Sequence, residues 1–185
     1  MSKTVYALID CQNDFIDGAL GVGYEQWSKA YDYIEKEFFK DYKEREYVFT
    51  FDTHPIDHCS FLDQGGPWPI HCVEGSMGAQ PYWKLKNWYL ENDVTWSYIQ
   101  KGMDVDKEEY GIDVLKHYRK EENISEVHIA GLCTDYCVKE SAIMTANAHP
   151  EVTVFVHLKG SVSISEDTER EAINQMKEVD NIRIV

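Results

Sequence analysis

Short apolar runs alternate with longer amphipathic segments along most of the chain. Runs typical of buried strands occupy six segments, at residues 3–9, 47–51, 94–99, 126–130, 152–157 and 182–185. Between them, apolar residues at helical spacing indicate helices at residues 25–44, 108–122, 136–149 and 165–179, the last with Ser165 as its N-cap. Strands that alternate with helices predict an α/β fold, with a mostly parallel sheet of six strands covered on both faces.

One segment interrupts this alternation. Residues 54–81, "HPIDHCSFLDQGGPWPIHCVEGSMGAQP", are rich in glycine and proline and too long for a simple connection. Loops of this length inside a compact domain are usually functional or disordered. The tryptophan, histidines and cysteines argue against disorder. We therefore expect this loop to carry part of a site.

Several polar residues come directly after predicted strands. Asp10, Asp52, Lys101 and the turn from Cys133 to Cys137 each follow a different apolar run. In a parallel sheet the carboxyl ends of the strands share one edge, where ligands bind in open α/β folds. These four distant segments should therefore converge on one crevice.

The composition sets limits on partners and location. A chain of 185 residues, 43% hydrophobic, suits one domain spanning residues 1–185. The formal net charge of −15 disfavours nucleic acid and anionic membranes as partners, and it otherwise serves solubility. Neither a membrane span nor a signal peptide is evident, so we expect a cytoplasmic protein whose five cysteines are unpaired, catalytic or metal-linked.

Cys137 is a candidate nucleophile. It lies in the first turn of a predicted helix, where free N–H groups and the helix dipole favour a thiolate and can stabilise an oxyanion. A small buried hydrophobic residue is an equally ordinary interpretation of such a cysteine. Lys101, which would lower the thiol pKa, and Asp10, which could accept its proton, favour the catalytic interpretation.

A second group of residues fits a metal ion. Asp52 and His54 are two positions apart at a strand end, and His71 lies on the returning part of the long loop. One carboxylate and two imidazoles suit zinc, manganese or iron, with positions left for water or substrate. His58 and Asp63 are possible further ligands. Two aromatic residues, Phe15 and Trp68, flank these groups and could either bind a flat ligand or simply pack.

Five motifs together are similar to one known family. The chain resembles the nicotinamidase branch of the isochorismatase-like cysteine hydrolases, from about residue 3 to residue 156. The motifs are "ALIDCQNDF", "FDTHPIDHCSF", "GGPWPIHCVEGSMGAQ", "IQKG" and "IAGLCTDYCVKESA". The first and last are typical of the superfamily, and the second and third are typical of its metal-binding branch.

The resemblance implies a role for most of these residues. It implies a Rossmann-like three-layer α/β/α fold and a catalytic triad of Asp10, Lys101 and Cys137. It also implies a cis peptide bond before Cys133 and an oxyanion hole formed by the amides of Cys133 and Cys137. Asp52, His54 and His71 would hold one divalent transition-metal ion, most often zinc. Phe15 and Trp68 would hold a flat substrate between their rings.

The implied activity is hydrolysis of nicotinamide to nicotinate and ammonia through a thioester. Rival hypotheses are hydrolysis of another small amide or of the vinyl ether of isochorismate, a metal- or ligand-binding protein without catalysis, and a redox protein using Cys133 and Cys137. The metal ligands argue against the vinyl ether, and the spacing of the two thiols argues against redox chemistry. The loop after Lys101, with Tyr110, departs from the family pattern. A homo-oligomer is possible, since family members occur in several oligomeric states.

Overall fold

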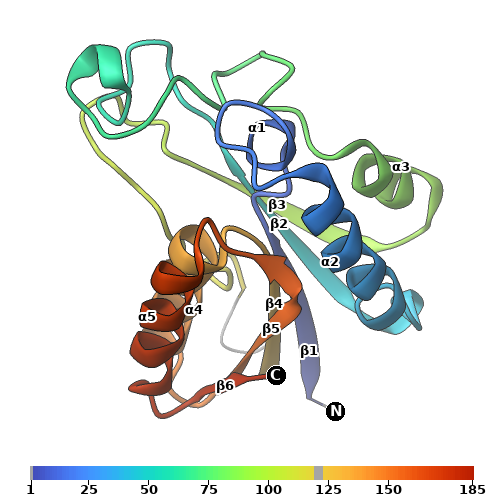
Figure 1. Cartoon of the computed structure of the whole chain (residues 1–185). Coiled ribbons are helices and arrows are strands. Elements are labelled where there is room, and N and C mark those ends of the chain that lie inside the picture. Colours follow the sequence, from blue (N-terminus) through green and yellow to red (C-terminus); the bar gives the residue numbers. More distant parts are fainter. Residues whose placement is uncertain (1, 119–122) are drawn as a thin grey trace.

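Six parallel strands form one sheet at the centre of the protein (Figure 1). The computed structural model describes residues 2–118 and 123–185. The strand order is β3-β2-β1-β4-β5-β6, and every adjacent pair runs parallel. The strands are β1 (Lys3–Ile9), β2 (Glu46–Asp52), β3 (Thr95–Lys101), β4 (Ile124–Leu132), β5 (Thr153–Val162) and β6 (Ile182–Ile184). The predicted α/β fold with a six-stranded sheet is confirmed.

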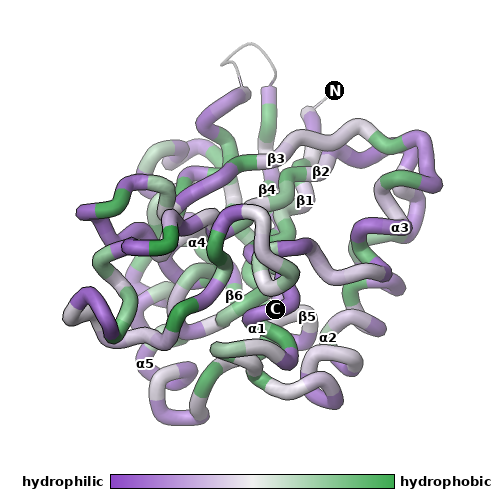
Figure 2. The backbone as a smooth tube through the Cα atoms, turned by 90° about the horizontal axis from the view of Figure 1, so that it is seen from above, coloured by the Kyte–Doolittle hydropathy of each residue, from purple (hydrophilic) through white to green (hydrophobic). Residues whose placement is uncertain are grey.

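Helices cover both faces of the sheet (Figures 1 and 2). The helices α2 and α3 lie on one side, and α4 and α5 lie on the other, so the protein has three layers. The helix bounds are α1 (Asn13–Ile16), α2 (Tyr24–Glu37), α3 (Trp83–Glu91), α4 (Lys139–Ala148) and α5 (Glu166–Lys177). Ser165 caps α5 as predicted, because its side chain accepts a hydrogen bond from the backbone N–H of Thr168.

Alternation of side chains along the strands divides the core into two halves. In β1, Ala7 and Ile9 pack with α4 and α5, while Leu8 packs with the aromatic residues of α2. Successive strand residues point to opposite faces, so a strand covered on both sides needs apolar residues at nearly every position. This explains the continuous apolar runs in the sequence.

Two helix predictions need correction. The helix predicted over residues 25–44 ends at Glu37, and Phe38 and Phe39, which follow it, are both buried in the core. Asp41 then adopts a left-handed backbone conformation, with φ of 54°, which an α-helix cannot contain. Of the helix predicted over residues 108–122, the part up to Tyr118 contains only turns, and residues 119–122 lie outside the described part of the chain.

Helix α3 was not predicted at all, and its pattern explains why. Only Leu85 is buried, while Trp83 and Leu90 are exposed, so apolar residues do not mark a single face. Across the described ranges, the structure contains no helix of the length and apolar character needed to cross a membrane.

Candidate active site

Asp10, Lys101 and Cys137 meet at the carboxyl edge of the sheet. Asp10 follows β1, Lys101 ends β3, and Cys137 lies in a π-helical turn, Thr134–Val138, that joins β4 to α4. The Nζ of Lys101 is 2.8 Å from Asp10 Oδ2 and 3.6 Å from Cys137 Sγ. All three side chains are buried. The parallel topology therefore brings together three residues separated by up to 127 positions in the sequence.

Asp10 is positioned for proton transfer. Its Oδ1 accepts a 2.6 Å hydrogen bond from the hydroxyl of Thr50, while Oδ2 makes the ion-pair contact with Lys101 but accepts no hydrogen bond. Burial raises the pKa of Asp10 above its ordinary value, although Lys101 opposes the shift. A carboxylate with a raised pKa, held beside an ammonium group, suits a general base that later returns its proton.

Lys101 occupies a cation position between acidic groups. Asp10, Asp52 and Cys137 have ligand atoms within 4.8 Å of one another, and the Lys101 ammonium contacts all three. Burial alone would lower the pKa of Lys101, but Asp10 and Asp52 outweigh it and keep the ammonium charged. In turn, although burial acts in the opposite direction, Lys101 and His54 hold the pKa of Asp52 at about 2.

The surroundings of Cys137 agree in part with the sequence-based expectation, because Lys101 lowers the pKa of the thiol while burial raises it more. We expected Lys101 and the helix start to favour a thiolate. Instead, burial raises the pKa of the Cys137 thiol well above its ordinary value, and the carboxylates of Asp10 and Asp52 add to the rise that Lys101 opposes. A base that takes the thiol proton would therefore favour attack by this sulfur.

Cys133 begins the turn that carries Cys137. The peptide bond between Leu132 and Cys133 is cis, as the resemblance implied. The carbonyl of Cys133 accepts hydrogen bonds from the N–H groups of Tyr136 and Val138, which fixes the turn. Burial raises the pKa of the Cys133 thiol as well, so its sulfur is an un-ionised lining group rather than a second thiolate.

Asp52, His54 and His71 form a cluster suited to a metal ion. One ligand atom from each lies within 4.8 Å of the others, and all three residues are buried. Nδ1 of His54 donates to the carbonyl of Gly102 and Nδ1 of His71 donates to the carbonyl of Pro69, both at 2.8 Å. Each ring is thereby oriented with Nε2 toward the cluster, where Nε2 of His54 lies 3.6 Å from the carboxylate of Asp52. Metal-binding histidines are commonly oriented through the other ring nitrogen in this way. The donor set and its geometry fit the implied ion.

The structure does not bring the two further ligand candidates into this cluster. Both nitrogens of His58 are already used, because Nδ1 bonds the Ser60 hydroxyl at 2.7 Å and Nε2 bonds the Lys107 carbonyl at 3.0 Å. Asp63 is exposed in a short 3₁₀ turn, Leu62–Gln64. His58 therefore packs against His54 with ring centroids 4.2 Å apart, and it supports the cluster rather than extending it.

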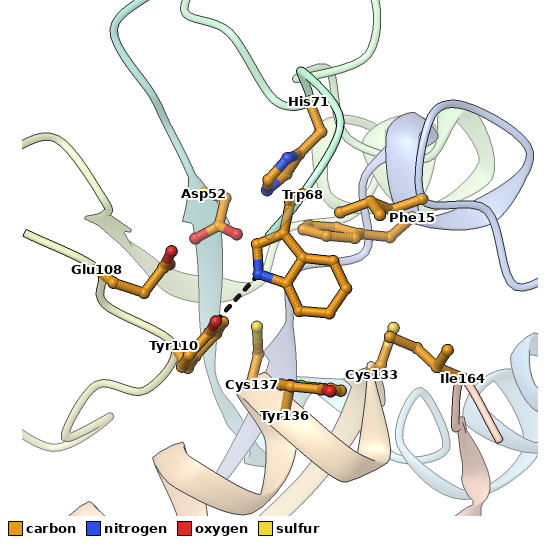
Figure 3. Close-up of a pocket in the computed structure, with 11 residues that line it drawn as sticks. Phe15, Asp52, Trp68, His71, Glu108, Tyr110, Cys133, Tyr136, Cys137 and Ile164 are labelled. Carbon is orange, nitrogen blue, oxygen red and sulfur yellow. Dashed lines mark hydrogen bonds between the residues drawn. The ribbon is translucent and has the colours of Figure 1, made fainter. Parts of the chain in front are cut away.

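An aromatic pocket opens above the thiols (Figure 3). Phe15 and Trp68 line it together with Asp52, His71, Cys133 and Cys137. The indole N–H of Trp68 donates a 3.0 Å hydrogen bond to the hydroxyl of Tyr110, and the Tyr136 ring packs edge-on to Trp68. The pocket thus joins the aromatic residues, the metal cluster and the candidate nucleophile in one space.

Sequence reasoning missed four other residues that line this pocket. They are Leu20, Glu108, Tyr136 and Ile164. Glu108 is half-buried, and burial raises the pKa of its carboxyl. The acidic run beside Tyr110 was a visible signal for Glu108, and the motif "TDYCV" was one for Tyr136. Leu20 and Ile164 belong to segments without such a signal.

Comparisons with known proteins agree with the fold and the motifs. The chain belongs to the isochorismatase domain family, whose model matches residues 4–182. A nicotinamidase/pyrazinamidase from Mycobacterium tuberculosis is 29% identical over 180 residues, covering 92% of each chain. A nicotinamidase from Saccharomyces cerevisiae is 29% identical over 161 residues, covering 80% of this chain and 72% of its own.

Solved structures are similar over the whole chain. The crystal structure of the pyrazinamidase of Pyrococcus horikoshii in complex with zinc superposes with a TM-score of 0.80 at 31% identity. The match covers 99% of this chain and 98% of that one. The resemblance inferred from the five motifs is therefore confirmed at the level of family and fold.

Proposed function

We propose that the protein, as one hydrolase domain over residues 1–185, hydrolyses nicotinamide to nicotinate and ammonia. The observation that carries the proposal is the position of Cys137, in contact with Lys101 and beside an aromatic pocket. The names of the related proteins, nicotinamidase and pyrazinamidase, support a heteroaromatic amide as substrate.

The first half of the reaction forms a thioester. Asp10 takes the proton from Cys137, and the sulfur attacks the carboxamide carbon of the substrate. Lys101 compensates the negative charge that passes between the two groups. When the tetrahedral intermediate collapses, the C–N bond breaks and Asp10 returns the proton to the leaving nitrogen, so that ammonia departs.

The second half releases the acid. Asp10 takes a proton from a water molecule, and the hydroxide attacks the thioester carbon. The C–S bond breaks, the proton held by Asp10 restores the Cys137 thiol, and nicotinic acid leaves and gives its carboxyl proton to solvent as nicotinate. Water is consumed once and the residues return to their starting states.

Two further groups of residues bind the substrate in this proposal. The backbone N–H groups of Cys133 and Cys137 stabilise the oxyanion of each tetrahedral intermediate. Phe15 and Trp68 hold the ring of the substrate between them, with Tyr110 fixing the indole through its hydrogen bond.

Asp52, His54 and His71 would hold one divalent transition-metal ion, with zinc preferred over manganese and iron. A bound ion supplies a Lewis acid that can anchor the ring nitrogen of the substrate. The chain's own contribution is to orient the two imidazoles through the carbonyls of Gly102 and Pro69.

The deciding experiment is ammonia release from nicotinamide by purified protein of measured metal content. Rapid release, with nicotinate as the second product, is the expected result. If the folded, metal-loaded protein releases ammonia from pyrazinamide or another small amide but not from nicotinamide, the substrate assignment is wrong while the amidase chemistry stands. If no amide yields ammonia, the protein is a binding protein and the proposal fails.

A further inference from the structure

A second groove lies on the opposite face of the sheet from the catalytic groups. Asp52 and Lys101 point into the active site, whereas their neighbours Phe51, Thr53 and Gln100 line a groove of about 300 Å³. The two sites are back to back because successive residues of β2 and β3 point to opposite faces. None of the residues that line the groove has a role in the proposed reaction.

The groove has an unusual proportion of aromatic side chains. Four of its eleven lining residues are aromatic, and they come from β2, β3 and α3. The rings of Tyr89 and Trp96 lie 4.8 Å apart, and those of Trp96 and Tyr98 lie 6.4 Å apart. Yet Trp96 is 39% exposed and Tyr98 is 56% exposed. Large aromatic rings that stay exposed around one hollow mark a binding surface.

One acidic side chain stands at the rim of the groove. Glu74 is the only charged residue among those that line it, and it forms no ion pair within the described ranges. Its backbone is held in place, because its N–H donates a 2.9 Å hydrogen bond to the carbonyl of His54. The neighbouring Gly75 leaves open space above the groove, with no atom within 4 Å of an added Cβ.

Charge decides which occupant suits the groove. Aromatic faces carry negative potential and attract cations, and a carboxylate beside them strengthens that attraction. A second copy of this chain is disfavoured, since each copy has a net charge of −15 and would bring another acidic surface toward Glu74. An anionic ligand would be repelled for the same reason.

We propose that this groove is a second ligand site that binds a small organic cation, such as a quaternary ammonium or N-alkylpyridinium group. Trp96 and Tyr98 contact the apolar surface of the cation, and Glu74 balances its charge. The interaction is non-covalent and does not depend on the proposed amidase activity, so the two proposals stand or fall separately.

The test is a titration with choline, compared with its uncharged isostere 3,3-dimethyl-1-butanol. The indole N–H signals of the five tryptophans, assigned through single Trp→Phe variants, report the location of binding in NMR spectra. We expect choline to shift the Trp96 signal in a saturable manner, with a dissociation constant on the order of millimolar, and to leave the Trp68 signal in place. The uncharged isostere should bind at least about threefold more weakly.

Two matched pairs of variants complete the test. Glu74→Gln should weaken choline binding about threefold or more, whereas Glu91→Gln, an exposed acid outside the groove, should not. Trp96→Leu should abolish binding, whereas Trp83→Phe, also exposed and outside the groove, should not. Equal binding of the isostere, a shift at Trp68 in place of Trp96, or no binding by the folded protein would each overturn the proposal. So would a dimer that Trp96→Leu dissociates, because the groove would then be an interface between copies.

Discussion

The Nζ of Lys101 lies 3.6 Å from the Sγ of Cys137, and both side chains are buried. Lys101 lowers the pKa of the Cys137 thiol, but burial and the carboxylates of Asp10 and Asp52 raise it further, so the net shift is upward. The lysine instead joins Asp10 and Cys137 into a unit through which a proton can pass with little change in net charge. The following predictions test that unit and the groups around it.

Cys137→Ala should lower ammonia release by about a thousandfold or more, because no thioester can form. Cys133→Ala should keep substantial activity, since only the backbone N–H of Cys133 has a role in the proposal. Both rates are measured with a coupled ammonia assay, and circular dichroism checks that the variants fold. Equal losses in two folded variants would mean that the nucleophile or its role has been assigned wrongly.

Lys101→Met should unfold at a lower urea concentration than the parent, because two buried carboxylates would lose their shared cation. The free energy of unfolding should fall by about 3–5 kcal/mol. Adding Asp10→Asn to this variant should recover part of the stability, since one of the two charges is removed. Lys29→Met serves as the control, because Lys29 and its partner Glu25 are exposed and its unfolding midpoint should not change. A Lys101→Met protein as stable as the parent would contradict the buried ion-pair network.

His71→Ala should lose bound metal, measured by elemental analysis after dialysis, because a ligand of the cluster is removed. His58→Ala is the matched control and should retain about one ion per chain, as both of its nitrogens are engaged elsewhere. Treatment with a chelator should remove most activity, and added zinc should restore it. Full activity in a metal-free sample would show that the ion has no role in the reaction.

Tyr110→Phe should raise KM for nicotinamide about threefold to tenfold with a smaller effect on kcat, because Trp68 loses the hydrogen bond that fixes its ring. Tyr98→Phe, which changes a tyrosine on the opposite face of the sheet, is the control for the substitution itself. Steady-state kinetics separate the two constants. A loss confined to kcat would indicate that Tyr110 acts in the chemical step instead.

Acid should destabilise the protein through His157. Burial, together with His128, lowers the pKa of His157 from 6.5 to about 4, and the ring is hydrogen-bonded to Tyr33 and His128 at 2.8 Å each. As the pH falls, the His157 imidazole of the unfolded chain therefore becomes protonated at a higher pH than that of the folded protein. The stability is complete above about pH 6.5 and decreases by about 3 kcal/mol toward pH 4.

This pH dependence is measured by urea unfolding at several pH values. His157→Gln should lose less stability than the parent between pH 6.5 and 4, because glutamine does not titrate. His117→Gln, at an exposed position, should follow the parent curve. Parallel curves for the parent and His157→Gln would assign the acid sensitivity to other groups.

The strands could be predicted more fully than the helices. Strands buried on both faces need apolar residues at almost every position, and such runs are visible in the sequence around Ala7 and Val48. Helix α3 was invisible because Trp83 and Leu90 remain exposed, and the end of α2 depends on where Phe38 and Phe39 find space in the core. The presence of α3 and the end of α2 are determined by tertiary packing and not by the local sequence pattern.

In the candidate site, too, some features could be predicted from the sequence and others depend on the folded structure. The motifs indicate the residues that the proposed reaction uses. Asp10 follows β1, Lys101 ends β3 and Cys137 follows β4, so the sheet edge gathers them. The motifs cannot show that both ring nitrogens of His58 form hydrogen bonds, one with Ser60 and one with Lys107. Hydrogen-bond partners of this kind come from distant parts of the chain and exist only after folding.

The sequence by itself determined the class of fold, the family and the residues gathered at the carboxyl edge of the sheet, because strand periodicity and parallel topology are local and general rules. Only the tertiary structure decided the direction in which the pKa of Cys137 shifts, which depends on burial and on the distances to Asp10, Asp52 and Lys101. It also decided that Phe51 and Gln100 line a second groove behind the catalytic groups. Electrostatic interactions and cavities depend on three-dimensional distances, which the order of residues does not contain.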